Sequence, residues 1–158
     1  AEVEGTATAA GCQLVASCAL ASASRLANFA TPGGNIGLFC STPMVAISRN
    51  LSNKHSMEML LTGELISSDK AAKIGLINDV IEINKLKDFV LNKASKISKK
   101  SSVTLKIGKE AFYKQLDMKL SDAYDYASKV MVQNMLKLDA KEGIDAFIDK
   151  REPKWKDK

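Results

Sequence analysis

The pattern most capable of chemistry lies near the start of the chain, where a short apolar stretch gives way to very small residues. Ala1 to Thr8 is typical of a strand that runs into a turn at Gly5, and Ala9 to Cys18 (AAGCQLVASC) of a tightly packed helix. A helix that begins directly after a strand offers backbone N–H groups that tiny side chains do not cover. Such a cluster can bind an anion or stabilise a developing oxyanion. The same residues also suit close backbone packing, so the pattern alone leaves both interpretations open.

The other reactive residue types are scattered and indicate no second site. Three cysteines, Cys12, Cys18 and Cys40, are too few for a disulfide-dense secreted scaffold and favour free thiols in a reducing compartment. No histidine stands near Cys40 in the sequence, so we expect a packed thiol and not a nucleophile. No cluster of ligand-type residues predicts a metal site.

Composition sets the broad class of the protein. The 158 residues are 46% apolar and 26% charged, which fits one folded domain and argues against a disordered chain. No run approaches the roughly 18 apolar residues of a membrane-spanning helix. The net charge of +5 arises after residue 48 and suits an anionic partner or, more simply, a solvated helical surface. No nucleic-acid-binding signature accompanies it, so we expect no nucleic-acid partner.

Short strands and helices must position the small-residue turn. We expect strands at 19–23, 28–30 and 76–81, and helices at 43–49 and 54–61. The run from Thr31 to Gly34 predicts a loop, because proline lacks an N–H and glycine tolerates positive φ. A further helix is expected to begin with Ser68 as its N-cap and to end at Gly75 in the left-handed conformation.

Amphipathic helices dominate beyond residue 82. Asp139 and Glu142 fit a capping box for the last helix, and the charged tail from Arg151 to Lys158 is expected to be mobile except at Pro153 and Trp155. We therefore divide the chain into a core at 1–82 and a helical region at 83–158. A sheet of two or three strands does not close a domain alone, so we expect a preceding segment or another chain to complete it.

The run V-x-G-x-A-x-x-x-G-C-x-L-x-x-x-C, beginning at Val3, resembles the central motif of the crotonase (enoyl-CoA hydratase/isomerase) family. The similarity continues through 29–32, 57–63 and 142–151 and spans essentially the whole chain. ATAAGCQLVASC and FATPGGNIGLFCSTP resemble one subgroup more than the hydratases proper. The resemblance implies an α/β fold: the C-terminal part of a spiral of ββα units, followed by a helical region that builds trimers. The family's N-terminal turns, which supply the first oxyanion N–H and much of the coenzyme A groove, have no counterpart here.

Carried over position by position, the resemblance places the second oxyanion N–H at Ala10, where the family usually has glycine. The first catalytic glutamate of the hydratases falls on Gln13 and the second on Gly33, so both carboxylates are absent. Each such group contributes about 10²–10⁴ in rate, and we therefore expect no ordinary hydratase activity. The resemblance also implies contacts with the acyl-CoA at Gly11, Thr31, Pro32, Phe147 and Lys150. For Lys150, a solvated position at the end of the last helix, favoured by the helix dipole, is an equal alternative.

These observations predict an acyl-CoA-binding family member that stabilises the thioester oxygen through backbone N–H groups. Coenzyme A enters as part of the substrate, with no permanent cofactor and no metal. Two alternatives stay open: a non-catalytic assembly or regulatory protein of fatty acid metabolism and, more weakly, an active hydratase or isomerase. We expect homo-oligomers, either a trimer or a dimer of trimers. The family is largely mitochondrial and a pI near 9.1 suits the matrix, with the cytoplasm as the alternative.

Overall fold

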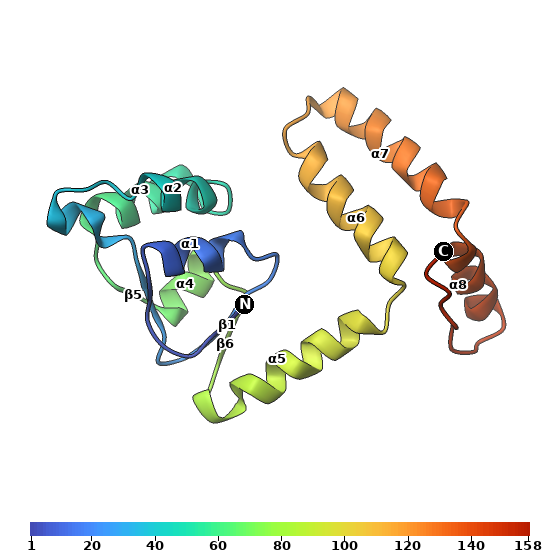
Figure 1. Ribbon diagram of the computed structural model, residues 1–158, viewed down its shortest axis with the longest axis horizontal. Coiled ribbons are helices and arrows are strands. Elements are labelled where there is room, and N and C mark those ends of the chain that lie inside the picture. The colour runs from blue at the N-terminus through green and yellow to red at the C-terminus, as the bar shows by residue number, and fades with distance from the viewer. The chain divides into compact units, whose positions relative to one another are not determined.

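The computed structural model describes residues 1–158, which form two compact units, Ala1–Lys93 and Ala94–Lys158. The boundary that we predict from the sequence, between residues 82 and 83, lies at the start of helix α5 (Ile83–Ser98). The boundary between the two compact units falls within this helix, after Lys93 (Figure 1).

Six short strands in the first unit form two small sheets. In one sheet, β3 (Ser22–Ser24) lies parallel to β1 (Glu2–Val3) and to β6 (Asp79–Ile81). In the other, β4 (Asn28–Ala30) lies parallel to β2 (Ala7–Thr8) and antiparallel to β5 (Ile66–Ser67). The bend near Gly5 thus lets one extended stretch serve both sheets.

The strands expected at 19–23 and 76–81 begin later than the sequence indicates. Asn78 explains the difference, because its side-chain oxygen accepts the Ala21 N–H at 2.8 Å and its own N–H donates to the Ala21 carbonyl at 2.7 Å. This exchange takes the place of a strand ladder ahead of Ser22 and Asp79. The strand expected at 28–30 has the predicted bounds.

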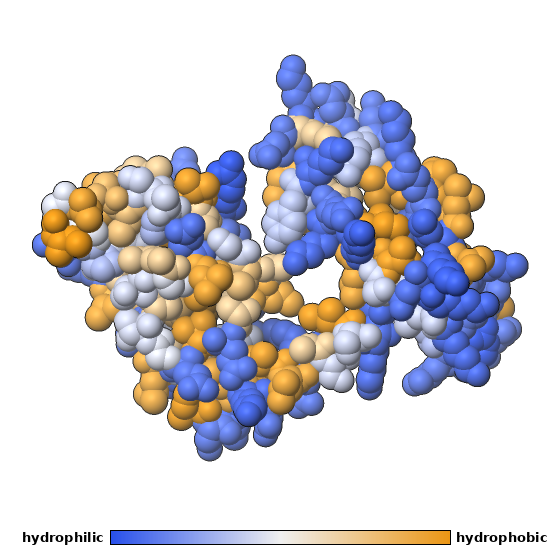
Figure 2. Space-filling view, viewed as in Figure 1, coloured by the Kyte–Doolittle hydropathy of each residue, from blue (hydrophilic) through white to orange (hydrophobic).

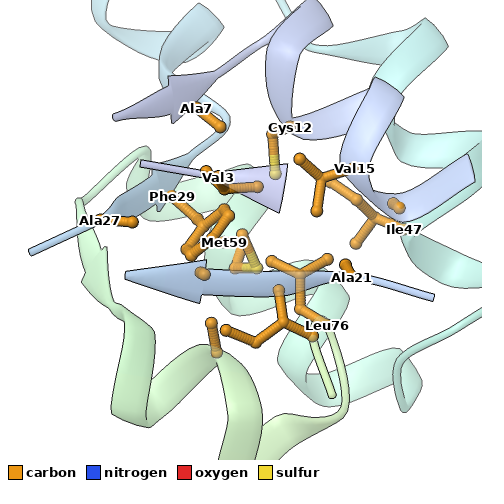
Figure 3. Packing of buried hydrophobic residues seen from close by; sticks show 14 of the residues in the cluster. Val3, Ala7, Cys12, Val15, Ala21, Ala27, Phe29, Ile47, Met59 and Leu76 are labelled. Atoms are coloured by element: carbon orange, nitrogen blue, oxygen red, sulfur yellow. The ribbon is translucent and has the colours of Figure 1, made fainter. Parts of the chain in front are cut away.

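The first unit also contains four complete α-helices. They are α1 (Ala10–Ser17), α2 (Ser41–Ser48), α3 (Asn53–Thr62) and α4 (Ser68–Ile74). Helices α3 and α4 end at Gly63 and Gly75 in the left-handed conformation, as predicted for Gly75. Cys12 and Val15 of α1 meet Ile47 of α2 and the fully buried Phe29 in the core (Figure 3).

Two local predictions in this unit are wrong. Ser67, and not Ser68, caps α4 by accepting the Lys70 N–H, while the buried Ser68 hydroxyl lies within hydrogen-bonding distance of the Ser24 and Ala27 carbonyls, at 2.6 and 2.8 Å. The Pro-Gly-Gly run is not an open loop, because residues Pro32–Ile36 form a 3₁₀ helix (η1). Proline suits the first turn of a helix, where no N–H is required, and the two glycines accommodate the tight turn.

The second unit contains three helices, α6 (Ser102–Gln115), α7 (Leu120–Met135) and α8 (Leu138–Ile148). Only Ser101, Asp139 and Ala146 are buried there. Many large apolar side chains reach the surface of this unit, among them Leu120, Met131 and Leu136 (Figure 2). No helix of the chain combines the length and the apolar character needed to cross a membrane.

The C-terminal tail is held in place, which corrects both the capping box and the mobile end predicted from the sequence. Asp139 accepts the backbone N–H groups of Lys156 and Asp157, at 2.7 and 3.1 Å. Glu142 accepts two hydrogen bonds from the Arg151 guanidinium and one from the Lys154 N–H. Both carboxylates therefore bind the returning tail instead of the helix start, and neither caps α8.

Candidate functional site

Two strand ends in the first unit meet at one edge of a sheet. Because β2 and β4 are parallel, with Thr8 opposite Ala30, the segments that follow them leave from the same edge. The Ala9 N–H donates to the Ala30 carbonyl at 3.0 Å and extends this pairing by one residue. The start of α1 and the start of η1 are thereby brought together, as the resemblance requires of Ala10 and Gly33.

Ala9 turns the chain from β2 into α1 through a conformation that disfavours a side chain. Its φ of 47° and ψ of −114° lie close to the first central position of a type II′ turn, which glycine normally occupies. Both of its backbone groups are fixed, because the N–H binds Ala30 and the carbonyl accepts the Gln13 N–H at 2.9 Å. Strain of this kind persists where the surrounding structure overrides it, and it is concentrated at functional sites.

The first amide groups of α1 are unused by the fold. The N–H groups of Ala10, Gly11 and Cys12 donate to no group of the chain, and no side chain caps this helix. Ala10 is exposed and Gly11 is half-buried, so small residues leave this helix start open. The positive end of the helix dipole adds to these donors, and together they favour an oxygen that carries negative charge.

Gln13 follows in the first turn of α1 and is half-buried. Its backbone carbonyl accepts the Ser17 hydroxyl at 2.8 Å, while its side-chain amide makes no hydrogen bond within the chain. An amide can donate and accept hydrogen bonds but does not take up a proton at neutral pH. This position therefore offers orientation of a ligand and no general base.

Three neighbouring residues are used by the fold itself. Thr31 is fully buried and its hydroxyl donates to the Met59 carbonyl at 2.9 Å. Pro32 begins η1 and is half-buried. Burial raises the pKa of the Cys12 thiol to about 11, and the nearby Cys40 adds to the effect, so this thiol is protonated at neutral pH and is no nucleophile.

Gly33, where the resemblance places the second glutamate, is bound on both sides by the chain that follows it. Its N–H donates to the Cys40 sulfur at 3.2 Å, and its carbonyl accepts the Leu38 N–H at 2.9 Å. Cys40 is buried, as expected for a packed thiol. Cys40 also accepts the hydrogen bond from Gly33. The sequence does not indicate this role, apart from the spacing of seven residues between the two positions.

The remaining predicted contacts, Phe147 and Lys150, belong to the second unit. Phe147 of α8 is 84% exposed, and Lys150, just beyond this helix, has a φ of 54° and is also exposed. Phe147 borders a cavity of about 380 Å³ that Trp155 and Asn134 also line. The Asn134 side-chain oxygen is buried there without a donor, a feature that the sequence pattern does not reveal.

Comparison with known proteins shows which family this chain resembles. The family description for enoyl-CoA hydratase/isomerase matches residues 1–158. The chain belongs to the enoyl-CoA hydratase/isomerase family. The resemblance inferred from the sequence motifs is thereby confirmed, together with the α/β fold that it implies.

Individual relatives confirm the subgroup as well. Enoyl-CoA hydratase domain-containing protein 3, mitochondrial, of Rattus norvegicus is 52% identical over 97% of the chain. The crystal structure of its human counterpart is 49% identical, with a TM-score of 0.93 over 96% of the chain. A crystal structure of enoyl-CoA hydratase from Mycobacterium smegmatis is 48% identical, with a TM-score of 0.95 over 97% of the chain.

The match covers a part of each relative. The chain spans about half the length of the curated relatives, 51% of the rat protein, and 60% of each of the two crystallised chains. Family membership and fold are shared over this part of the relatives. The activity of a whole family member does not follow from a match over this part.

Proposed function

We propose that this protein binds an acyl-CoA thioester and holds its carbonyl oxygen at the start of α1. The observation that carries the proposal is the open cluster of N–H groups at Ala10 and Gly11, which follows the strained Ala9. Backbone donors aimed at a carbonyl oxygen stabilise the charge that develops on it. The family resemblance assigns the same role to the Ala10 N–H and takes a second N–H from the family's N-terminal turns.

The chemistry at this position is restricted. Gln13 and Gly33 stand where hydratases have carboxylates, and the Cys12 thiol is protonated. Hydration requires one group to activate water and another to deliver a proton, and neither Gln13 nor Gly33 can do so. The protein therefore stabilises a thioester or its enolate without the usual acid/base pair, and coenzyme A is part of the ligand and not a resident cofactor.

A non-catalytic assembly role is the second candidate, and the surface of the second unit favours it. Ala146 is the single buried apolar residue of that unit, while Leu120, Leu136 and Phe147 are each more than 75% exposed. Apolar surface of this extent marks an interaction face. We propose that copies of the protein associate through it, as a trimer or a pair of trimers, and that the protein works in mitochondria, as the names of its relatives state of them.

Calorimetric titration separates the two candidates. Butyryl-CoA and S-butyl-CoA differ only by the carbonyl group, so a site that hydrogen-bonds this oxygen binds butyryl-CoA about tenfold more tightly. Equal affinity for the two compounds would show that the carbonyl is not recognised. Failure of both to bind would leave the assembly role as the function.

A hydration assay tests the weaker alternative, an active hydratase. We expect no turnover of crotonyl-CoA above the uncatalysed background. Turnover that Gln13→Ala abolishes would establish the protein as an enzyme and would contradict the proposal of a site without acid/base catalysis.

A further inference from the structure

The position of Gly33 has no space for a side chain. A Cβ atom placed there would lie 2.7 Å from the Leu38 carbonyl oxygen and 2.8 Å from the Cys40 sulfur. Carbon atoms in proteins do not approach other heavy atoms so closely, because repulsion rises steeply below van der Waals contact. A Cβ at the adjacent Gly34 would meet nothing within 4 Å.

The backbone beyond η1 causes this enclosure. Gly37 takes a left-handed conformation with a φ of 76° and turns the chain back toward the start of η1. Leu38 then donates its N–H to the Gly33 carbonyl, and the buried Cys40 sulfur accepts the Gly33 N–H. The N–H and the carbonyl of Gly33 are therefore both hydrogen-bonded to the segment from Leu38 to Cys40, which fixes the backbone of the turn at this point.

We infer that Cys40 positions this turn and closes position 33 of the site to any side chain. The inference rests on the proposed function and narrows it. The protein therefore binds thioesters whose chemistry needs no carboxylate at position 33, beside the carbonyl. The backbone around Gly33 leaves no space for the second glutamate of the hydratases. A glutamate at position 33 would have to displace the Leu38 carbonyl, a backbone atom, before it could act.

A pair of glycine variants tests the enclosure without any ligand. Gly33→Ala is expected to lower the Tm by about 5 °C or more, whereas Gly34→Ala, in the same turn, changes it little. Removal of the sulfur by Cys40→Ala relieves one of the close contacts, so Gly33→Ala costs less in that background. Equal melting temperatures for the two glycine variants would overturn the inference.

The positioning role of Cys40 has a separate readout in hydrogen exchange at the Gly33 amide. This amide is expected to exchange at least about tenfold faster in Cys40→Ala, and Cys40→Ser, which keeps an acceptor atom, is expected to restore protection. A general loss of stability would raise exchange at many amides and would not distinguish serine from alanine in this way. Unchanged exchange in Cys40→Ala would exclude the role.

The functional consequence is tested by attempting to install the hydratase residues. Gln13→Glu combined with Gly33→Glu is expected to hydrate crotonyl-CoA no faster than Gln13→Glu alone. Gly34→Glu serves as the folding control, and unfolding of Gly33→Glu but not of Gly34→Glu supports the enclosure. Hydration by the double variant would overturn it. Because butyryl-CoA binding by the unaltered protein is measured independently, failure of the proposed function is distinguishable from failure of this inference.

Discussion

Replacement of Ala9 by glycine tests the strand-to-helix turn on which the proposed site depends. Ala9 has a φ of 47° and a ψ of −114°, and its N–H and carbonyl are both bound by the surrounding chain. Glycine adopts this conformation without a steric penalty. Ala9→Gly is therefore expected to stabilise the first unit, although glycine destabilises most regular positions.

The magnitude follows from two opposing contributions. A residue held in a sparsely populated region of φ and ψ costs about 1–3 kcal/mol. Glycine forfeits about 0.5–1 kcal/mol through the larger entropy of its unfolded chain. The free energy of unfolding should thus rise by about 1 kcal/mol, which corresponds to a Tm increase of about 4–8 °C in a unit of this size.

The assay must report on the first unit, because the chain's one tryptophan, Trp155, lies in the second. Calorimetric unfolding combined with hydrogen exchange of the α1 amides meets this requirement. Ala10→Gly is the matched control, since Ala10 is an ordinary helical residue at the start of α1 and glycine there is expected to be destabilising. Ala9→Val is expected to destabilise the unit, because a β-branched side chain fits positive φ poorly.

A loss of stability in Ala9→Gly equal to that in Ala10→Gly would refute the reasoning. It would show that Ala9 does not adopt the positive-φ conformation at this turn. The turn at Ala9 would then not orient the open N–H groups at the start of α1, and the proposed carbonyl-binding site would be refuted as well.

Two further predictions concern the corrected helix starts and the tail. Ser68→Ala removes a buried hydroxyl that lies within hydrogen-bonding distance of two carbonyls, and it should cost about 1–3 kcal/mol. Ser67→Ala removes an exposed cap and should cost about 1 kcal/mol, so chemical denaturation that ranks the two variants in reverse would contradict the assignment. Hydrogen bonds from Arg151 and from the Lys154 N–H lower the pKa of Glu142 from 4.5 to about 2, so its stabilisation of the tail is complete above about pH 4.5 and is lost as the pH falls toward 2. Trp155 fluorescence should follow this loss, and Glu142→Gln should show less change over the same range; identical pH profiles would refute the link.

The sequence by itself determined the features that depend on neighbouring residues. The strand at 28–30 and the left-handed end of α4 at Gly75 follow from local conformational preference, since glycine adopts positive φ without a steric penalty. The sequence also predicts α1 to within one residue at each end. The motif from Val3 to Cys18, together with the matches that continue along the chain, likewise identified the family.

Only the tertiary structure decided which polar groups meet. Ser67 and Ser68 are equivalent as local cap candidates, and the choice depends on the Ser24 and Ala27 carbonyls, which lie more than 40 residues away. Asp139 matches a capping pattern but is taken by the returning tail. Hydrogen-bond partners and free space are set by segments that are distant in the chain, and local propensity carries no information about them.

The site shows the same division on a smaller scale. The residue types at Gln13 and Gly33 indicated that two carboxylates are absent. The sequence did not indicate that Leu38 and Cys40 fill the space beside Gly33, because this depends on the path of the backbone through the left-handed Gly37. Residue identity thus indicated which chemistry is missing, and backbone packing leaves no room for a side chain at position 33.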